Sequence, residues 1–201
     1  MAKSITSKRI VTPVCRIDYP NLFQPDDNGK YTAVLLFDKQ GFNAKPFKEI
    51  LQEVKDEVAA SVYKGGQIPP SADMNALKDG DVPNSNGNLP FKGYYYCNVK
   101  TQFQPGIVSS YPDPSGKLKA NGQPAPMVIT DPNEIYPGVY ARACIHAYWY
   151  DNRGQKGIRF SLNGLQKVKD GERIQHSSSL DAFECSSTAE IQESIDSLMD
   201  L

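Results

Sequence analysis

The sequence has little histidine, tryptophan or cysteine. With only His146 and His176, and without a G-x-S-x-G sequence, it carries no local signature of a Ser or Cys hydrolase. It also has no P-loop and no G-x-G-x-x-G sequence. The four cysteines are widely spaced and form no C-x-x-C pair, which favours free thiols in a reducing compartment over a zinc site or a disulfide framework. We therefore expect a protein that is not an enzyme and that needs no metal or cofactor.

Long hydrophobic runs are also missing. One of the longest, at 33–37, is far too short to cross a bilayer, and the N-terminus is polar rather than a signal peptide. These features predict a soluble, cytoplasmic protein with no membrane segment. The chain has 201 residues, enough for one domain of about 150 to 180 residues with an ordinary core. Fifteen Gly, fifteen Pro and eleven Tyr favour a strand-rich fold with many turns.

Positive charge is absent from the end of the chain. All 22 Lys and Arg lie at or before Arg173, whereas residues 181–201 carry six acids. Residues 1–180 therefore have a net charge of +5, which the total of −1 conceals. This division predicts a polyanion-binding domain at 1–176 and a disordered acidic tail at 177–201. The tail residues that we expect to contact protein partners are Glu190, Glu193, Asp196, Leu198, Asp200 and Leu201.

The order of local patterns predicts mostly strands and one long helix. Residues 8–17 and 31–37 are rich in β-branched and aromatic residues and predict an antiparallel pair. In 44–63, apolar residues recur at steps of three and four, with Gly65 as a stop signal, so this segment predicts a helix. Strand character returns at 94–103. The segments 65–90 and 111–126 are rich in turn residues and predict long loops.

The clearest alternation begins at Val139. From there to residue 150, small and apolar residues occupy the odd positions, and polar, aromatic or basic residues occupy the even ones. After a loop at 151–155, residues 158–163 alternate in the same way. Together they predict a hairpin with one apolar face and one aromatic, cationic face. If Trp149 rather than Tyr148 faced outward, a bulge would have shifted this register by one residue.

The aromatic, cationic face predicts a surface for single-stranded nucleic acid. Such a strand exposes phosphates and base faces, so cations and flat rings bind it without sequence preference, each stacked base contributing about 1–3 kcal/mol. A row of Tyr is also common on a face that is packed or that binds protein, and this alternative remains open. With an extension onto the earlier strand, the expected DNA-binding residues are Tyr94, Tyr96, Lys100, Tyr140, Arg142, His146, Tyr148, Tyr150, Arg153, Lys156 and Arg159.

An ordered series of short segments resembles a known family. They are 105–108 (PGIV), 134–138 (EIYPG), 140–142 (YAR), 156–158 (KGI) and 162–172 (LNGLQKVKDGE). With the strands that begin at 12 and 31, they are similar to the tailed-phage single-stranded DNA-binding proteins, once listed as a domain of unknown function. The resemblance covers most of residues 8–173.

This resemblance implies an OB fold, which is a Greek-key β-barrel, with one long α-helix, long inserted loops and a disordered acidic C-terminal tail. It implies DNA held in a groove by Tyr140, Arg142, Tyr148 and Lys156, and further by Lys100, Tyr150 and Arg159. The implied function is to coat and protect single-stranded DNA in phage replication or recombination, in the cytoplasm of the infected bacterium. We expect a monomer or homodimer whose tail competes with DNA and recruits phage or host replication or recombination proteins.

Two other functions remain open at this point. One is a structural or protein-interaction component of the phage, with the Tyr-rich face as its interface. The other is a metal-dependent nuclease or junction-processing enzyme that uses Asp79 and Asp81. The first predicts no DNA affinity at any salt concentration, and the second predicts magnesium-dependent cleavage.

Overall fold

The computed structural model describes residues 4–84, 86–89, 91–152 and 154–176. The predicted tail at 177–201 and Arg153 lie outside the described residues. In chain order, the elements are β1 (Ile10–Val11), β2 (Cys15–Asn21), β3 (Tyr31–Asp38), α1 (Lys45–Ser61), β4 (Lys78–Asp79), β5 (Tyr94–Thr101), β6 (Gly106–Pro112), β7 (Pro126–Val128), the 3-10 turn η1 (Pro132–Glu134), β8 (Tyr140–Asn152) and β9 (Gln155–Lys169).

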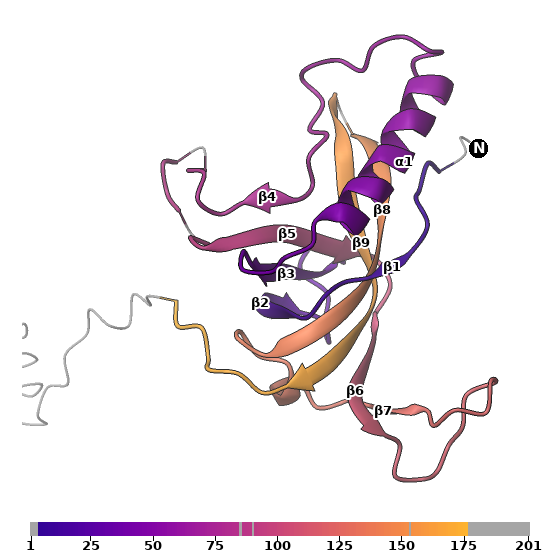
Figure 1. Cartoon of the computed structure of the whole chain (residues 1–201), viewed down its shortest axis with the longest axis vertical. Helices are drawn as coiled ribbons and strands as arrows, with labels where there is room; N and C mark the ends of the chain where they lie inside the picture. The colour runs from indigo at the N-terminus through magenta and orange to yellow at the C-terminus, as the bar shows by residue number, and fades with distance from the viewer. Residues whose placement is uncertain (1–3, 85, 90, 153, 177–201) are drawn as a thin grey trace, which may run out of the picture.

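Five of the strands close into a barrel. β2 pairs with β3, β3 with β5, β5 with β9, β9 with β8, and β8 again with β2 (Figure 1). All of these pairs are antiparallel except β5 and β9, which run parallel where Val99 meets Phe160. A five-stranded ring with Greek-key connections is the OB fold. The fold that the resemblance implied is therefore confirmed.

The remaining strands extend the barrel at its margins. β6 pairs in parallel with β9, and with β7 it forms an arm that projects from the barrel (Figure 1). The loop predicted at 111–126 joins the two strands of this arm, but the strand character of β6 was not predicted. The strand predicted at 8–17 is divided into β1 and β2, because Pro13 has no N–H to donate to a strand partner.

Helix α1 covers one side of the barrel, as its apolar spacing predicted. The buried side chains of the helix are Phe47, Ile50, Leu51, Val54 and Val58. The Phe47 ring contacts those of Phe37 and Phe160 at centroid distances of 5.1 and 5.9 Å. Helix and barrel therefore share one hydrophobic core. In the described part of the chain, no helix has the length and apolar character that would be needed to cross a membrane.

The β8–β9 hairpin has the predicted alternation. Ala141, Ala143, Ile145 and Ala147 are fully buried, and the residues between them face outward. Register shifts occur at Tyr140/Ala141 and Cys144/Ile145, but the extra residue lies on β9 each time, so the alternation of β8 is unbroken. Trp149 packs inward and perpendicular to Tyr63, with the ring centroids 6.4 Å apart. The alternative register, with Trp149 outward, does not occur.

Candidate nucleic-acid interface

Two concave pockets of about 520 and 560 Å³ adjoin on the outer face of the barrel. Both are lined by Lys100 and Tyr148, so they form one continuous depression, which we call the barrel groove. It crosses β3 and β5, follows the β8–β9 hairpin and reaches the N-terminal segment. Its exposed and half-buried Tyr and Phe side chains are Tyr19, Phe103, Tyr148 and Tyr150. Its cationic side chains are Arg9, Lys30, Lys100 and Arg159.

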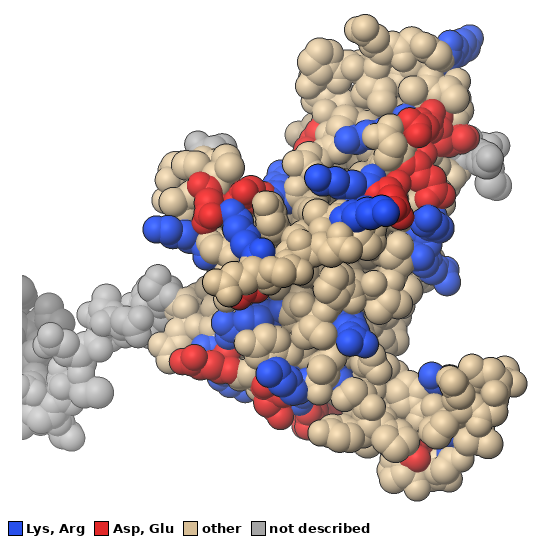
Figure 2. All heavy atoms as spheres, in the orientation of Figure 1, with Lys and Arg blue, Asp and Glu red and all other residues tan. Residues whose placement is uncertain are grey.

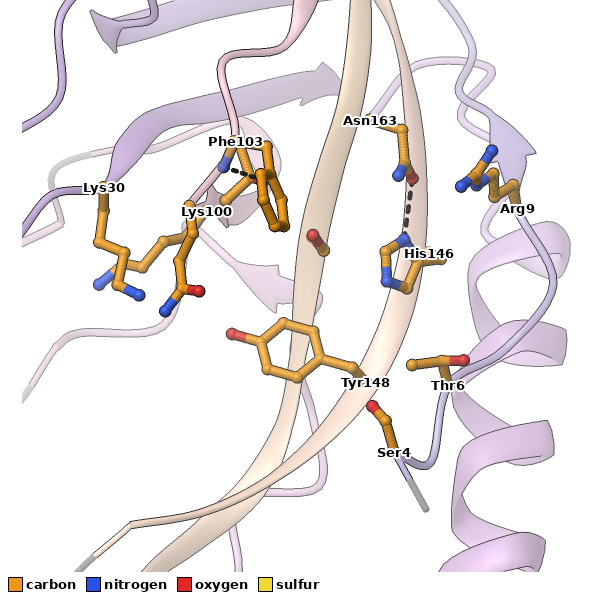
Figure 3. A pocket seen from close by; sticks show the side chains of 12 residues that line it. Ser4, Thr6, Arg9, Lys30, Lys100, Phe103, His146, Tyr148 and Asn163 are labelled. Carbon is orange, nitrogen blue, oxygen red and sulfur yellow. Dashed lines mark hydrogen bonds between the residues drawn. The ribbon is translucent and has the colours of Figure 1, made fainter. Parts of the chain in front are cut away.

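Two lysines line the same pocket as the Tyr148 ring. Lys30 ends the β2–β3 loop, where the Asp26 carboxylate accepts its backbone N–H at 2.8 Å, and Lys100 lies on the outer face of β5. Both side chains line the pocket that Tyr148 also lines, and in Figure 3 the Tyr148 hydroxyl points toward the side of the pocket on which they lie. Burial raises the pKa of Tyr148, so its ring stays neutral near a phosphate. The arrangement offers a stacking surface beside two positive charges.

His146 faces the groove from the other side of Tyr148 (Figure 3). Its Nδ1 is 2.8 Å from the side-chain oxygen of Asn163, which lies on β9. In this contact Nδ1 carries a proton and donates it to the Asn163 oxygen. The imidazole is therefore held in one orientation.

Arg159 and Tyr150 form the hairpin end of the groove. The guanidinium carbon lies 4.8 Å from the centroid of the Tyr150 ring, and Nη1 donates to Asp73 at 2.8 Å. Partial burial would raise the pKa of Asp73, but the hydrogen bond from Arg159 and the charge of Lys78 lower it. Asp73 thus stays ionised and fixes the guanidinium against the ring.

The loop at 65–90 supports this end of the groove. Asp73 donates its backbone N–H to Lys156 at 3.0 Å and accepts from Ile158 at 2.8 Å, so the loop joins the edge of β9. Gly157 permits the contact, because a Cβ there would lie 2.3 Å from the Asp73 carbonyl oxygen. Further along, β4 pairs with Tyr95 and Tyr96 of β5. This segment is therefore attached to the sheet at two places.

The structure brings together five of the eleven predicted DNA-binding residues. Those that line the groove are Lys100, His146, Tyr148, Tyr150 and Arg159. Lys156 is close by at the hairpin tip, where it pairs with Asp151 at 3.0 Å. Arg153 lies outside the described residues.

The other four predicted residues lie away from the groove. Tyr140 and Arg142 are eight and six residues before Tyr148 on β8, which is about 26 and 20 Å at 3.3 Å per residue. The Lys169 ammonium lies 4.6 Å from the centroid of the Tyr140 ring. Tyr94 and Tyr96 are on β5, and the Tyr96 ring packs on Phe91 at 4.8 Å. The even positions of a 13-residue strand share a face without sharing a site.

Among the cationic residues of the groove and its exposed or half-buried Tyr and Phe residues, the sequence analysis missed four: Arg9, Tyr19, Lys30 and Phe103. The strand predicted at 94–103 ends at Thr101, and Phe103, which is 80% exposed, lies beyond that end, where the alternation of a strand assigns it to neither face. Arg9 reaches the groove because the N-terminal segment pairs with β8, where Ser7 donates its N–H to Ala147 at 2.9 Å. These placements depend on contacts between distant parts of the chain, which local patterns do not encode.

Asp79 and Asp81, the two acids of the nuclease alternative, both pair with a lysine. The Lys39 ammonium binds both Asp79 and Asp81, at 2.5 Å from the Asp81 carboxylate. These hydrogen bonds from Lys39 lower the pKa of both carboxyls. Asp81 also accepts the Gly93 N–H at 2.7 Å, so the pair fastens β4 and its loop beside β5. Over the described ranges, no group of three potential metal ligands occurs.

The surface charge is mixed on the face shown in Figure 2, where Lys and Arg alternate with Asp and Glu and most of the surface is uncharged. No single basic field covers this face. Together with the modest net charge of +5 for residues 1–180, this distribution means that aromatic contacts must supply a large share of any affinity for a polyanion.

A closed OB barrel with aromatic and cationic side chains on its strand face defines the class of oligonucleotide- and oligosaccharide-binding folds. Residues 8–195 match the family model described as Enterobacter phage Enc34, ssDNA-binding protein. The chain therefore belongs to this family, and the predicted resemblance is confirmed. The sequence has no match among curated proteins.

Solved structures agree with this assignment at the level of the fold. The single-stranded DNA-binding protein from bacteriophage Enc34, in complex with ssDNA, is similar with a TM-score of 0.58 and 22% identity, over 87% of this chain and 100% of that one. A C-terminal truncation of the Enc34 protein is similar with a TM-score of 0.58 and 23% identity, over 83% of this chain and 88% of that one. The gp2.5 single-stranded DNA-binding protein of bacteriophage T7 has a TM-score of 0.57 and 15% identity, over 90% of this chain and 97% of that one.

Proposed function

We propose that this protein binds single-stranded DNA without sequence preference, and coats and protects it during phage replication or recombination in the host cytoplasm. The observation that carries the proposal is the barrel groove, in which Tyr148 lies between Lys100 and His146. Membership of the phage family supports it, as does the Enc34 relative, whose structure was determined in complex with ssDNA.

The groove suits a single strand for two physical reasons. Lys30, Lys100 and Arg9 neutralise phosphates and release their counterions, which makes binding sensitive to salt. Tyr148, Tyr150 and Phe103 offer rings for bases, and stacking on them tolerates any sequence because every base has a π-face. A duplex keeps its base faces inside its own stack, so it can use only the phosphate contacts. Preference for the single strand follows.

Titration of fluorescent poly-dT and of a matched duplex, at two salt concentrations and with Mg²⁺ present, tests this function. We expect saturable binding of poly-dT that weakens as salt rises, with both DNAs intact afterwards. A protein-interaction module would bind neither DNA at either salt concentration. A nuclease would cleave DNA, and the cleavage would disappear in Asp79→Asn and Asp81→Asn variants.

The acidic segment at 181–201 is, in this proposal, a competitor for the groove and a contact for replication or recombination proteins. The segment carries a charge of −6, which is as large as the net charge of +5 on residues 1–180, and this supports competition between the segment and DNA. Deleting 181–201 is expected to raise affinity for poly-dT at low salt, and less at high salt because screening weakens the competition. Unchanged affinity at low salt would remove the competitor role. A scrambled segment of equal charge is the matched control, and it should restore wild-type affinity.

A further inference from the structure

Tyr19, at one end of the barrel groove, is stacked on a second aromatic side chain, that of His176. The rings of Tyr19 and His176 have centroids 4.2 Å apart and planes inclined by 19°. The Tyr19 hydroxyl lies 3.1 Å from His176 Nδ1. Tyr19 lines the groove together with Tyr148 and Tyr150. His176 therefore covers one face of an aromatic ring that lines the groove.

A buried acid fixes the imidazole in this place. His176 Nε2 lies 2.8 Å from the Asp18 carboxylate, whose residue is only 1% exposed, and the same oxygen accepts the Tyr19 N–H at 2.9 Å. The chain before His176 is also attached, since Arg16 donates to the Glu172 carbonyl at 2.6 Å and Ile174 donates its N–H to Pro137 at 3.0 Å. The stack is thus a defined contact at the end of an anchored segment.

The backbone of Tyr19 directs its ring to this position. The residue has φ +44°, in the left-handed region that bulky side chains seldom adopt, and it lies at a register shift between β2 and β3. Bulges of this kind redirect a side chain, and strained residues of this kind gather at binding sites. Tyr19 remains 54% exposed although His176 stacks on it. A stacking role explains why a tyrosine is held in this conformation at the groove.

We propose that His176 is a reversible cap on Tyr19. An imidazole is a flat aromatic ring, as a nucleobase is, and the two cannot occupy the same face of Tyr19 together. An incoming base therefore replaces His176 on the tyrosine and breaks its hydrogen bond to Asp18. Because the acidic segment begins at Asp181, five residues after His176, DNA occupancy of the groove also releases the attachment that precedes that segment. This inference rests on the proposed function.

Affinity measurements on full-length variants test the cap. The stack opposes DNA, so we expect His176→Ala to tighten binding of a dT oligomer by about 2- to 12-fold, the range for an aromatic pair. Tyr19→Ala is expected to weaken binding by about 5-fold or more through loss of a base stack. In the Tyr19→Ala background, His176→Ala should have no effect, because no stack remains to be removed. Gln175→Ala, at an exposed neighbour in the same segment, is the control and should match wild type.

Proton NMR of the wild type tests the displacement without relying on a variant that folds poorly. Only two histidines are present, and His176→Ala assigns their signals. We expect the His176 ring signal to be shifted by the Tyr19 ring current in the free protein and to lose that shift at saturating dT, while the His146 signal reports that the groove is filled. A His176 signal that keeps its shift while His146 responds would overturn the cap and leave the proposed function standing. Failure of His146 to respond, with no binding by wild type, would instead overturn the proposed function.

Discussion

Replacing Tyr148 with alanine is expected to lower the affinity for a dT oligomer by about 5- to 150-fold, which corresponds to one lost base stack of about 1–3 kcal/mol. Tyr148 lines both pockets that make up the barrel groove, so its removal interrupts the path of the strand at its middle. Tyr148→Phe keeps the ring and should stay close to wild type. Fluorescence titration with the same oligomer measures the affinity of the wild type and of both variants.

Tyr111→Ala is the matched control for this prediction. Tyr111 is 70% exposed and lies on β6, in the projecting arm rather than in the groove. Its removal should leave affinity unchanged. If Tyr148→Ala binds as tightly as wild type, or if Tyr111→Ala loses as much affinity, the strand does not follow the groove that we describe.

Replacing Phe47 with alanine is expected to lower the free energy of unfolding by about 3–5 kcal/mol, the usual cost of truncating a buried phenylalanine. Phe47 is fully buried and its ring contacts Phe37, Phe42 and Phe160, so the change leaves a cavity where helix α1 meets the barrel. Urea denaturation of wild type and variant measures the difference.

Phe103→Ala is the control for this second prediction, because the same residue type is 80% exposed there. Its stability should match wild type, while its affinity for the dT oligomer falls. The two phenylalanines thus separate folding from binding. A Phe47→Ala variant of wild-type stability would show that α1 is not part of the core.

Sequence periodicity predicted the elements whose environment is set locally. Helix α1 and the β8–β9 hairpin each have one face in the core. Their apolar residues therefore recur with a period of 3.6 in the helix and 2 in the strands. The same rule placed Tyr148 outward and Trp149 inward. Strand β6 was missed because Gly106–Pro112 has only two buried positions and exposes its last three residues.

The site was predicted only in part, for a different reason. Periodicity assigns a residue to a face, but the groove occupies a short stretch of that face, where β3, β5 and the N-terminal segment approach the hairpin. Tyr140 shares the face of Tyr148 and lies about 26 Å away along the strand. Tyr19 is brought to the groove by a bulge, and Lys30 by a loop whose ends are joined through β2 and β3. Such positions depend on strand order and register, which single segments do not reveal.

The affinity of the wild-type protein for a dT oligomer, compared with a duplex of the same length at equal salt, tests the central claim most directly. The groove places aromatic rings beside its cations, and only a single strand can use both, so the account predicts tighter binding of the single strand at both low and high salt. The preference should grow as salt screens the phosphate contacts that both DNAs share. Equal affinity for the two, or tighter binding of the duplex, would contradict it, because a duplex leaves no base face for Tyr148 to stack on.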